Sequence, residues 1–126
     1  MLIDDLKKKK IAIIGVSEDP QKYGYKIFKD LINAGFNVVG INPKGKNILG
    51  KKIYRNVTEI KPIPDIALTV VPPAITEGIV AECAQAGVKE IWMQPDSESD
   101  DAINRAKKLG IKTTFNACFM VQSKIW

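Results

Sequence analysis

The sequence predicts an α/β fold in which helices cover both faces of a mainly parallel, five-stranded sheet, a doubly wound, three-layer αβα arrangement. Short apolar runs without polar alternation recur five times, which is typical of strands buried on both faces. Helical segments or a longer excursion separate these runs, as expected where each strand returns parallel to the one before. A chain of 126 residues is of single-domain size, and we expect residues 1–126 to form one domain.

The first apolar run, Ile11–Ser17, predicts the central strand of this sheet, and Gly15 ends the strand because glycine lets the backbone turn sharply. After a polar turn, apolar residues recur at helical spacing over Tyr25–Ile32. The free N–H groups at the start of this helix predict an anion-binding site. Four lysines, Lys7–Lys10, precede the strand. A nucleic-acid patch or a targeting signal is one interpretation, but we favour the solvated end of a short N-terminal helix.

The rest of the chain repeats this pattern. Further buried strands are predicted at residues 36–41, 65–71, 88–93 and 111–115, and helices at residues 76–86 and from Ser99 or Asp100 to Leu109. Residues 47–57 have turn chemistry and predict an excursion, and the apolar part of the tail is expected to dock on the domain. With the strands numbered along the chain, connection rules predict the order 3-2-1-4-5. Ligands of such sheets bind where the order reverses, here between the first and fourth strands.

The charge of the chain favours small phosphorylated ligands. The net charge is +5, and Arg55 and Arg105 are the only arginines among 19 basic residues. Lysine binds phosphate as a point charge, whereas base-specific readout favours the arginine fork, so sequence-specific nucleic-acid binding is disfavoured. No apolar run reaches the ~18 residues of a membrane span, and acids near the N-terminus argue against a signal peptide. We therefore expect a cytoplasmic protein that binds no membrane.

Histidine and cysteine usage limits the possible chemistry. The chain has no histidine, which excludes a Ser-His-Asp or Cys-His nucleophile, a histidine metal ligand and a phosphohistidine. Cys83 and Cys118 are far apart and form no CxxC motif, so neither a metal site nor a disulfide framework is predicted. Cys118 is the only candidate nucleophile, and a buried, inert thiol is the favoured interpretation.

The segments after the first and second strands indicate which nucleotides could bind. The G-x-G-x-x-G fingerprint is absent, because the glycine that follows Gly15 is Gly24. The acid that would hold an NAD ribose is replaced by Asn42, with Lys44 and Lys46 beyond it, so NAD is disfavoured. An uncharged residue followed by lysines can instead accept a phosphate on the ribose, as in NADP or in the 3'-phospho-ADP end of coenzyme A. Solvated loop charges are the remaining alternative.

Two proline-containing segments follow the third and fourth strands. One interpretation of Val71–Pro73 is purely structural: the prolines form a rigid start of a helix, because a proline in the first helical turn loses no hydrogen bond. Its place at a strand end also suits a flat apolar wall for a ligand, and Gln94 with the proline after it would complete the rim. Trp92 lies within a strand and is interpreted as packing, whereas Tyr25 on the first helix could face the pocket or the solvent.

Several segments form a combination that is more specific than any one of them: Ile11–Ser17 (IAIIGVS), Gly35–Pro43 (GFNVVGINP), Ile48–Tyr54 (ILGKKIY), Val71–Pro73, Gly87–Trp92 with Gln94, and Cys118. In these segments the chain resembles the stand-alone coenzyme A-binding domain family, which is similar to the N-terminal domain of the succinyl-CoA synthetase α subunit. The resemblance runs from about Lys9 to Val121, nearly the whole chain. It implies a Rossmann-like fold with coenzyme A lying across the carboxyl ends of strands one to four.

The resemblance also implies roles for the loops. The segment after strand one would face phosphate, the residues after strand two would flank the nucleotide, the prolines after strand three would line a third side, and the glutamine after strand four would line the last side. With two residues of the first turn and helix, the candidate cofactor-binding residues are Gly15, Val16, Ser17, Lys22, Tyr25, Asn42, Pro43, Lys44, Val71, Pro72, Pro73 and Gln94. The synthetase uses a catalytic histidine carried by a later domain. This chain has no histidine, so ligase chemistry is not implied.

Three hypotheses for function follow. The first is a non-catalytic module that binds coenzyme A or an acyl-CoA and acts as a carrier, a sensor or a regulatory partner of an unspecified protein. The second is an NADP-binding reductase-like protein, for which only Tyr25 or Tyr54 is available as a proton donor. The third is an interaction protein whose nucleotide pocket is vestigial.

Overall fold

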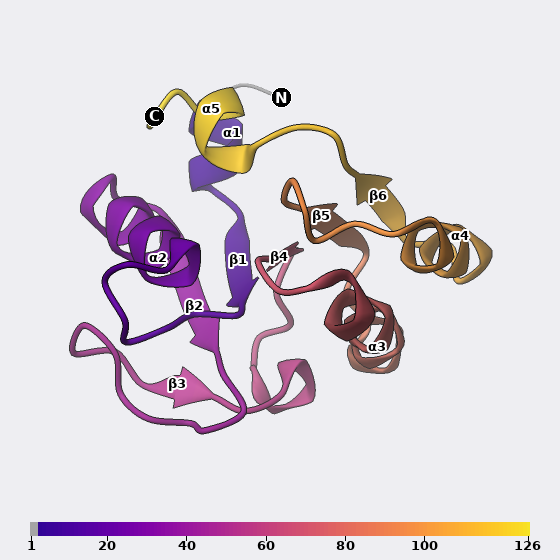
Figure 1. The fold of residues 1–126 in the computed structure, drawn as a ribbon, viewed down its shortest axis with the longest axis horizontal. Helices are drawn as coiled ribbons and strands as arrows, with labels where there is room; N and C mark the ends of the chain where they lie inside the picture. Colours follow the sequence, from indigo (N-terminus) through magenta and orange to yellow (C-terminus); the bar gives the residue numbers. More distant parts are fainter. Residues whose placement is uncertain (1–2) are drawn as a thin grey trace.

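The computed structural model describes residues 3–126 as a six-stranded, fully parallel sheet with helices on both faces (Figure 1). The strands are β1 (Lys10–Ile14), β2 (Asn37–Ile41), β3 (Ile53–Tyr54), β4 (Ile66–Thr69), β5 (Glu90–Met93) and β6 (Lys112–Thr114). Their order in the sheet is β3-β2-β1-β4-β5-β6, and every pair of neighbours is parallel. The doubly wound α/β fold is therefore confirmed.

The predicted strand order and strand number are wrong in one region. The segment expected as an excursion contains β3, whose Ile53 pairs with Gly40 and occupies the outer edge of β2. That edge is therefore not free for the next strand, and β4 pairs with the other edge of β1, where Ile66 lies opposite Ile11. The order reverses between β1 and β4, rather than between β1 and the strand at residues 88–93. A two-residue strand carries no periodic signal, which is why the sequence pattern missed it.

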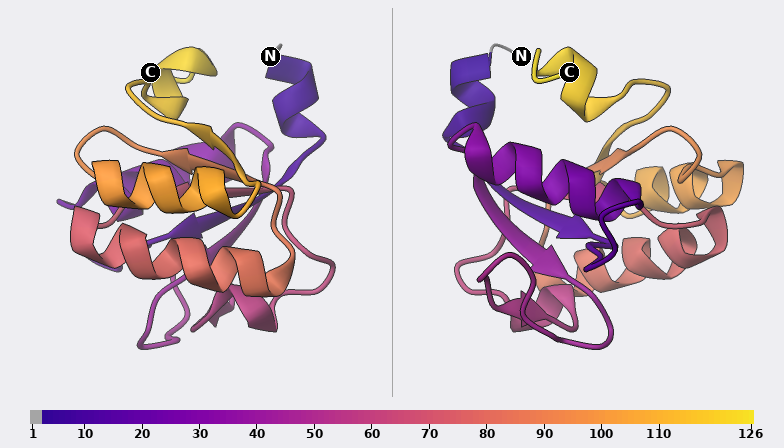
Figure 2. Two further views of the ribbon diagram at one scale, coloured as in Figure 1. Left: turned by 90° about the vertical axis from the view of Figure 1, so that its right-hand side faces the viewer. Right: turned by 60° about the vertical axis from the view of Figure 1, so that its left-hand side comes forward.

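The helices form two layers around the sheet. They are α1 (Ile3–Lys7), α2 (Tyr23–Asn33), the 3-10 helix η1 (Val57–Glu59), α3 (Pro73–Ala86), α4 (Asp100–Lys108) and α5 (Phe119–Gln122). Figure 2 shows α3 and α4 side by side over one face of the sheet and α2 across the opposite face. The short helices α1 and α5 both lie at one end of the sheet. As predicted, α1 ends in the lysine-rich segment that leads into β1.

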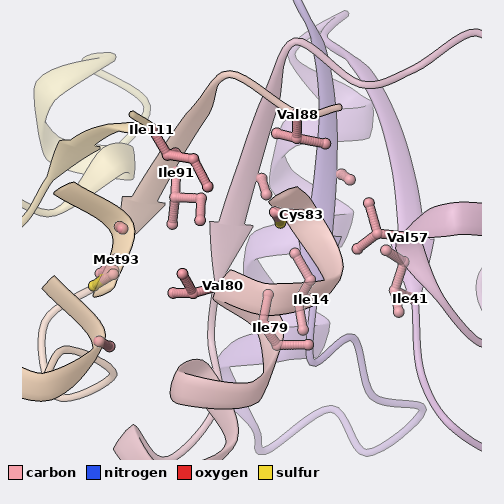
Figure 3. Packing of buried hydrophobic residues seen from close by; sticks show 14 of the residues in the cluster. Ile14, Ile41, Val57, Ile79, Val80, Cys83, Val88, Ile91, Met93 and Ile111 are labelled. Atoms are coloured by element: carbon pink, nitrogen blue, oxygen red, sulfur yellow. The ribbon is translucent and has the colours of Figure 1, made fainter. Parts of the chain in front are cut away.

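The central strand contributes to both hydrophobic layers. Ile11 and Ile13 belong to the cluster beneath α2, while Ala12 and Ile14 belong to the cluster beneath α3 and α4. Figure 3 shows part of the second cluster, in which Ile14 lies near Ile79 of α3. Because alternate side chains of a strand point to opposite faces, an unbroken apolar run is what a strand covered on both sides requires.

The tail docks on the domain, as predicted, and the structure places it on the α2 face. Phe119 and Met120 are fully buried, and the Phe119 ring packs edge-on against Trp92 with 5.0 Å between centroids. The Trp92 indole N–H donates to the Ala117 carbonyl oxygen at 2.9 Å, which confirms the packing role inferred for this tryptophan. At the other helix ends, Ser99 caps α4 by accepting the Ala102 N–H at 3.1 Å, and α3 begins at Pro73, three residues earlier than predicted.

None of the helices in the described part of the chain has the length and apolar character that a membrane crossing requires. Across residues 3–126, histidine, cysteine and acidic side chains form no group suited to holding a metal ion.

Candidate functional site

A cleft of about 670 Å³ opens at the carboxyl ends of β1, β2 and β4, next to the point where the strand order reverses. It is lined by Ile14, Gly15, Val16, Ser17, Lys22, Ile41, Asn42, Pro43, Arg55, Val70, Val71, Pro72, Ala74, Ile75, Gly78, Ile79 and Glu82. The structure therefore brings together the predicted segments after the first, second and third strands. This is the position where open parallel sheets hold their ligands.

Two glycines form the tight junction at the floor of the cleft. Gly15 has a φ of 104°, and a Cβ there would overlap the Val70 carbonyl oxygen and lie 2.6 Å from Cγ1 of Val71. A Cβ at Gly24, in the first turn of α2, would overlap the Gly15 carbonyl oxygen. Gly15 requires glycine for its positive φ and its contact with the end of β4, and Gly24 requires it so that the first turn of α2 can lie directly against the end of β1. The sequence pattern counted Gly24 only against a dinucleotide fingerprint and missed this role.

Hydrogen bonds between its own residues hold the loop between β1 and α2 in place. Ser17 Oγ accepts the Asp19 N–H at 3.0 Å, and the Asp19 carbonyl oxygen accepts the Lys22 N–H at 3.0 Å. Lys22 is the N-cap of α2, and no side chain in the described part of the chain caps the helix there. The first-turn N–H groups of α2 thus carry partial positive charge beside the cleft.

Asn42 joins the loops after β1 and β2. Its Nδ2 donates to the Val16 carbonyl oxygen at 2.8 Å, and its Oδ1 accepts the Lys44 N–H at 2.8 Å. Asn42 therefore lines the cleft while its side chain fixes the two loops against each other. An acid at this position would have no N–H with which to make the bond to Val16.

A second hollow of about 440 Å³ adjoins the cleft. Its lining comprises Ser17, Glu18, Asp19, Lys22, Asn42, Pro43, Lys44, Lys46 and Ile48, of which four residues also line the cleft. Lys44 and Lys46 are exposed, so their ammonium groups are free to meet a solvent-facing anion. The three lysines outnumber the two acids, which makes this hollow suited to a phosphate beside the main cleft.

The opposite wall comes from α3. Val71 and Pro72 approach from the end of β4, while Ile75 lies on the first turns of the helix and is 52% exposed in spite of its apolar side chain. Gly78 follows one helical turn later, and nothing lies within 4 Å of where its Cβ would be. Pro73 begins α3 and is exposed outside the cleft lining. This wall offers apolar surface to the flat or extended part of a ligand.

Two charged residues of the cleft were not among the sequence candidates. Arg55 follows β3, and Glu82 lies on the face of α3 turned to the cleft. Burial raises the pKa of the Glu82 carboxyl above its ordinary value, while a hydrogen bond from the Val57 backbone acts in the opposite direction. No motif marks either residue, because their positions depend on the unpredicted strand β3 and on the rotation of α3.

Gln94 and Tyr25 lie elsewhere. Gln94 is buried, and its Oε1 accepts the Phe119 N–H at 2.6 Å, so it holds the docked tail and lines a separate small pocket. Tyr25 is half-buried against the hydrophobic cluster beneath α2. Cys118 is half-buried rather than buried and lines the same small pocket as Gln94. Burial and the neighbouring Glu82 charge raise the pKa of the Cys83 thiol to about 12, so that thiol is unreactive.

Comparison with known proteins decides the family. The sequence profile of the CoA binding domain family matches residues 9–124. The chain belongs to this CoA binding domain family. The match includes every segment that lines the cleft, from the loop after β1 to the face of α3.

Members and relatives of the family include enzyme subunits and small proteins. The chain is 39% identical over 82 residues to the α subunit of acetate--CoA ligase [ADP-forming] II of Pyrococcus furiosus, which covers 64% of this chain and 18% of the relative. It is 30% identical over 128 residues to acetate--CoA ligase [ADP-forming] I of Archaeoglobus fulgidus, which covers 93% of this chain and 19% of the relative. The structure of a conserved hypothetical protein of Pyrococcus furiosus superimposes with a TM-score of 0.87 at 39% identity, covering 90% of this chain and 98% of the other.

The lengths of these proteins differ in a way that matters for function. The chain spans only 12–19% of the length of the first acetate--CoA ligases that it matches. By contrast, it covers nearly all of the small Pyrococcus furiosus protein. The shared part is therefore a CoA-binding domain and not a whole ligase.

Proposed function

We propose that the cleft binds coenzyme A, with the nucleotide end over the carboxyl ends of β1 and β2. The observation that carries this proposal is the junction of the two hollows. An apolar cleft and a lysine-rich hollow share Ser17, Lys22, Asn42 and Pro43 as a common wall. A ligand that spans both must combine an apolar or aromatic part with a phosphate outside it, as coenzyme A does.

Each part of the ligand has a suitable partner. The diphosphate would lie over Gly15–Ser17, against the uncapped start of α2, where free N–H groups favour anions. The 3'-phosphate would meet Lys44 and Lys46 in the adjoining hollow. The apolar wall of Val71, Pro72 and Ile75 would take the adenine ring or the pantetheine arm. Of the other candidates, Lys22 lines both hollows, whereas Tyr25 and Gln94 lie outside the cleft.

We further propose that the chain performs no chemistry of its own and serves as a carrier, sensor or regulatory module. The sequence contains no histidine, which is the residue that the related synthetase uses in catalysis. The NADP-reductase hypothesis has weaker support, because neither Tyr25 nor Tyr54 is among the described residues that line the cleft. A cytoplasmic location remains a proposal, supported by the two cysteines being free thiols.

Charge reversal in the adjoining hollow tests the assignment of the 3'-phosphate. We expect Lys44→Glu with Lys46→Glu to weaken CoA binding by about tenfold or more, because an exposed lysine contributes up to ~1 kcal/mol to an ion pair and reversal adds repulsion. Dephospho-CoA lacks the 3'-phosphate, so its affinity should change far less. Isothermal titration calorimetry of each ligand measures both effects.

Lys89→Glu is a control for charge reversal away from the cleft. Lys89 is an exposed lysine next to the amino end of β5, whereas the cleft lies at the carboxyl ends of the strands, so its reversal alters net charge without touching the cleft. It should leave both affinities within a factor of about two. If the double variant weakens CoA and dephospho-CoA equally, the lysines do not hold the 3'-phosphate.

A further inference from the structure

A third pocket lies beside the cleft, at the carboxyl ends of β4 and β5. Its volume is about 190 Å³, and it is lined by Tyr23, Ile27, Val70, Gln94, Pro95, Asp96, Cys118 and Trp126. Val70 lines both this pocket and the main cleft. The main cleft and this pocket therefore adjoin each other at Val70, directly after the end of β4.

Two aromatic side chains form the outer wall of the pocket. Tyr23 at the start of α2 and Trp126 lie with ring centroids 6.1 Å apart, and they are 65% and 45% exposed. The Trp126 indole N–H donates to Asp30 Oδ2 at 2.7 Å, which holds the ring over the pocket. Exposed aromatic surface of this kind gains stability when an apolar group covers it.

The inner wall carries one oriented hydrogen-bond donor. Gln94 is only 6% exposed, and its Oε1 accepts the Phe119 N–H, which fixes the direction of the side-chain amide. Its Nε2 donates to Cys118 Sγ at 3.4 Å. An amide nitrogen carries two N–H groups and sulfur is a weak acceptor, so among the described residues this donor retains capacity for a ligand carbonyl.

The charge around the pocket disfavours an anionic ligand. Among the described residues of the lining, Asp96 alone has a charged side chain, and the carboxylate of Asp30 accepts the Trp126 indole N–H. Lys26 holds its ammonium 5.6 Å from the centroid of the Tyr23 ring but is not part of the lining. A free carboxylate on the acyl group would thus meet no cationic side chain among the described residues of the pocket wall.

We infer that this pocket receives the acyl group of a CoA thioester, and that it selects small, uncharged, apolar acyl groups. Gln94 Nε2 would donate to the thioester carbonyl, and the hydrocarbon part would lie between Ile27 and the Trp126 ring. A cavity of roughly 150 Å³ holds one benzene molecule, so a pocket of this size suits a short, branched or single-ring acyl group. The inference rests on the proposed binding of coenzyme A in the main cleft, and it adds the class of thioester.

Titration with CoA, butyryl-CoA and succinyl-CoA in parallel tests this inference. Butyryl-CoA should bind about tenfold more tightly than CoA, the factor expected when about two CH₂ groups are buried. Succinyl-CoA, which places a carboxylate in the same pocket, should bind no more tightly than CoA. Equal affinity for CoA and butyryl-CoA, or a preference for succinyl-CoA, overturns the acyl assignment while leaving CoA binding intact. Failure of all three ligands to bind overturns the proposed function itself.

Two variants locate the effect. Trp126→Ala removes one of the two rings of the outer wall, and Cys118→Met fills part of the pocket, so each should reduce the preference for butyryl-CoA at least threefold and leave CoA affinity unchanged. Val121→Ala is the control, because Val121 is an exposed apolar residue of α5 outside the pocket. Thermal melting confirms that each variant is folded. A folded Trp126→Ala protein with an undiminished butyryl-CoA preference contradicts the inference.

Discussion

Gly24→Ala tests whether the close approach of α2 to the end of β1 builds the cleft. In most helices this change is favourable, since alanine stabilises a helix interior by about 1 kcal/mol relative to glycine. Here the new Cβ would overlap the Gly15 carbonyl oxygen and lie 3.0 Å from its carbonyl carbon and 3.3 Å from the Val16 Cα. These are backbone atoms that cannot rotate away, so α2 must move. Overpacking of this kind costs about 1–3 kcal/mol, so after the helix-propensity gain we expect a net loss of up to about 2 kcal/mol.

Gly78→Ala provides the matched comparison. Gly78 is also helical, in α3, but nothing lies within 4 Å of its Cβ position. The same substitution there should stabilise the protein by up to ~1 kcal/mol. Urea unfolding of the ligand-free variants, followed by circular dichroism, gives both free energies of unfolding. If Gly24→Ala is as stable as Gly78→Ala, the glycine contact at the floor of the cleft does not constrain α2.

Two further predictions follow from titratable groups. Burial raises the pKa of Glu82, so the folded state binds a proton more tightly than the unfolded state and loses stability as pH rises through the raised value. Glu82→Gln should therefore raise the melting temperature at pH 7 and give no gain well below the ordinary value near 4.5; a gain that persists at low pH would assign the effect to packing instead. Native protein should react with a thiol reagent such as DTNB at Cys118, which is half-buried, and not at Cys83, whose pKa is raised to about 12. Rapid labelling of both thiols before unfolding would contradict the buried position of Cys83.

The sequence specified the fold where local patterns were strong. The β1 run predicted a strand covered on both faces, and Ile13 and Ile14 do lie in opposite hydrophobic clusters. The strand order was not predictable in the same way, because it depends on β3. Ile53 and Tyr54 are too few to show alternation, yet their pairing with β2 directs β4 to the other side of β1.

The residues of the candidate site were likewise predictable only where a local pattern placed them. Residues directly after strands, such as Ser17, Asn42 and Pro72, could be placed in one cleft because carboxyl ends of parallel strands meet at one edge. Glu82 could not, because its place in the cleft depends on how α3 is rotated above the sheet. Gln94 also follows a strand, but the docked tail engages its side chain through the Phe119 N–H and turns it toward the smaller pocket.

The most direct test of the central claim is calorimetric titration of the ligand-stripped protein with CoA, dephospho-CoA, NADP and NAD in parallel. We predict that CoA binds most tightly, that dephospho-CoA binds about tenfold more weakly through loss of the contacts to Lys44 and Lys46, and that NAD does not bind measurably. Binding of NADP without CoA would contradict the account and favour a reductase. Absence of binding by all four ligands would contradict it as well and would favour an interaction protein with a vestigial pocket.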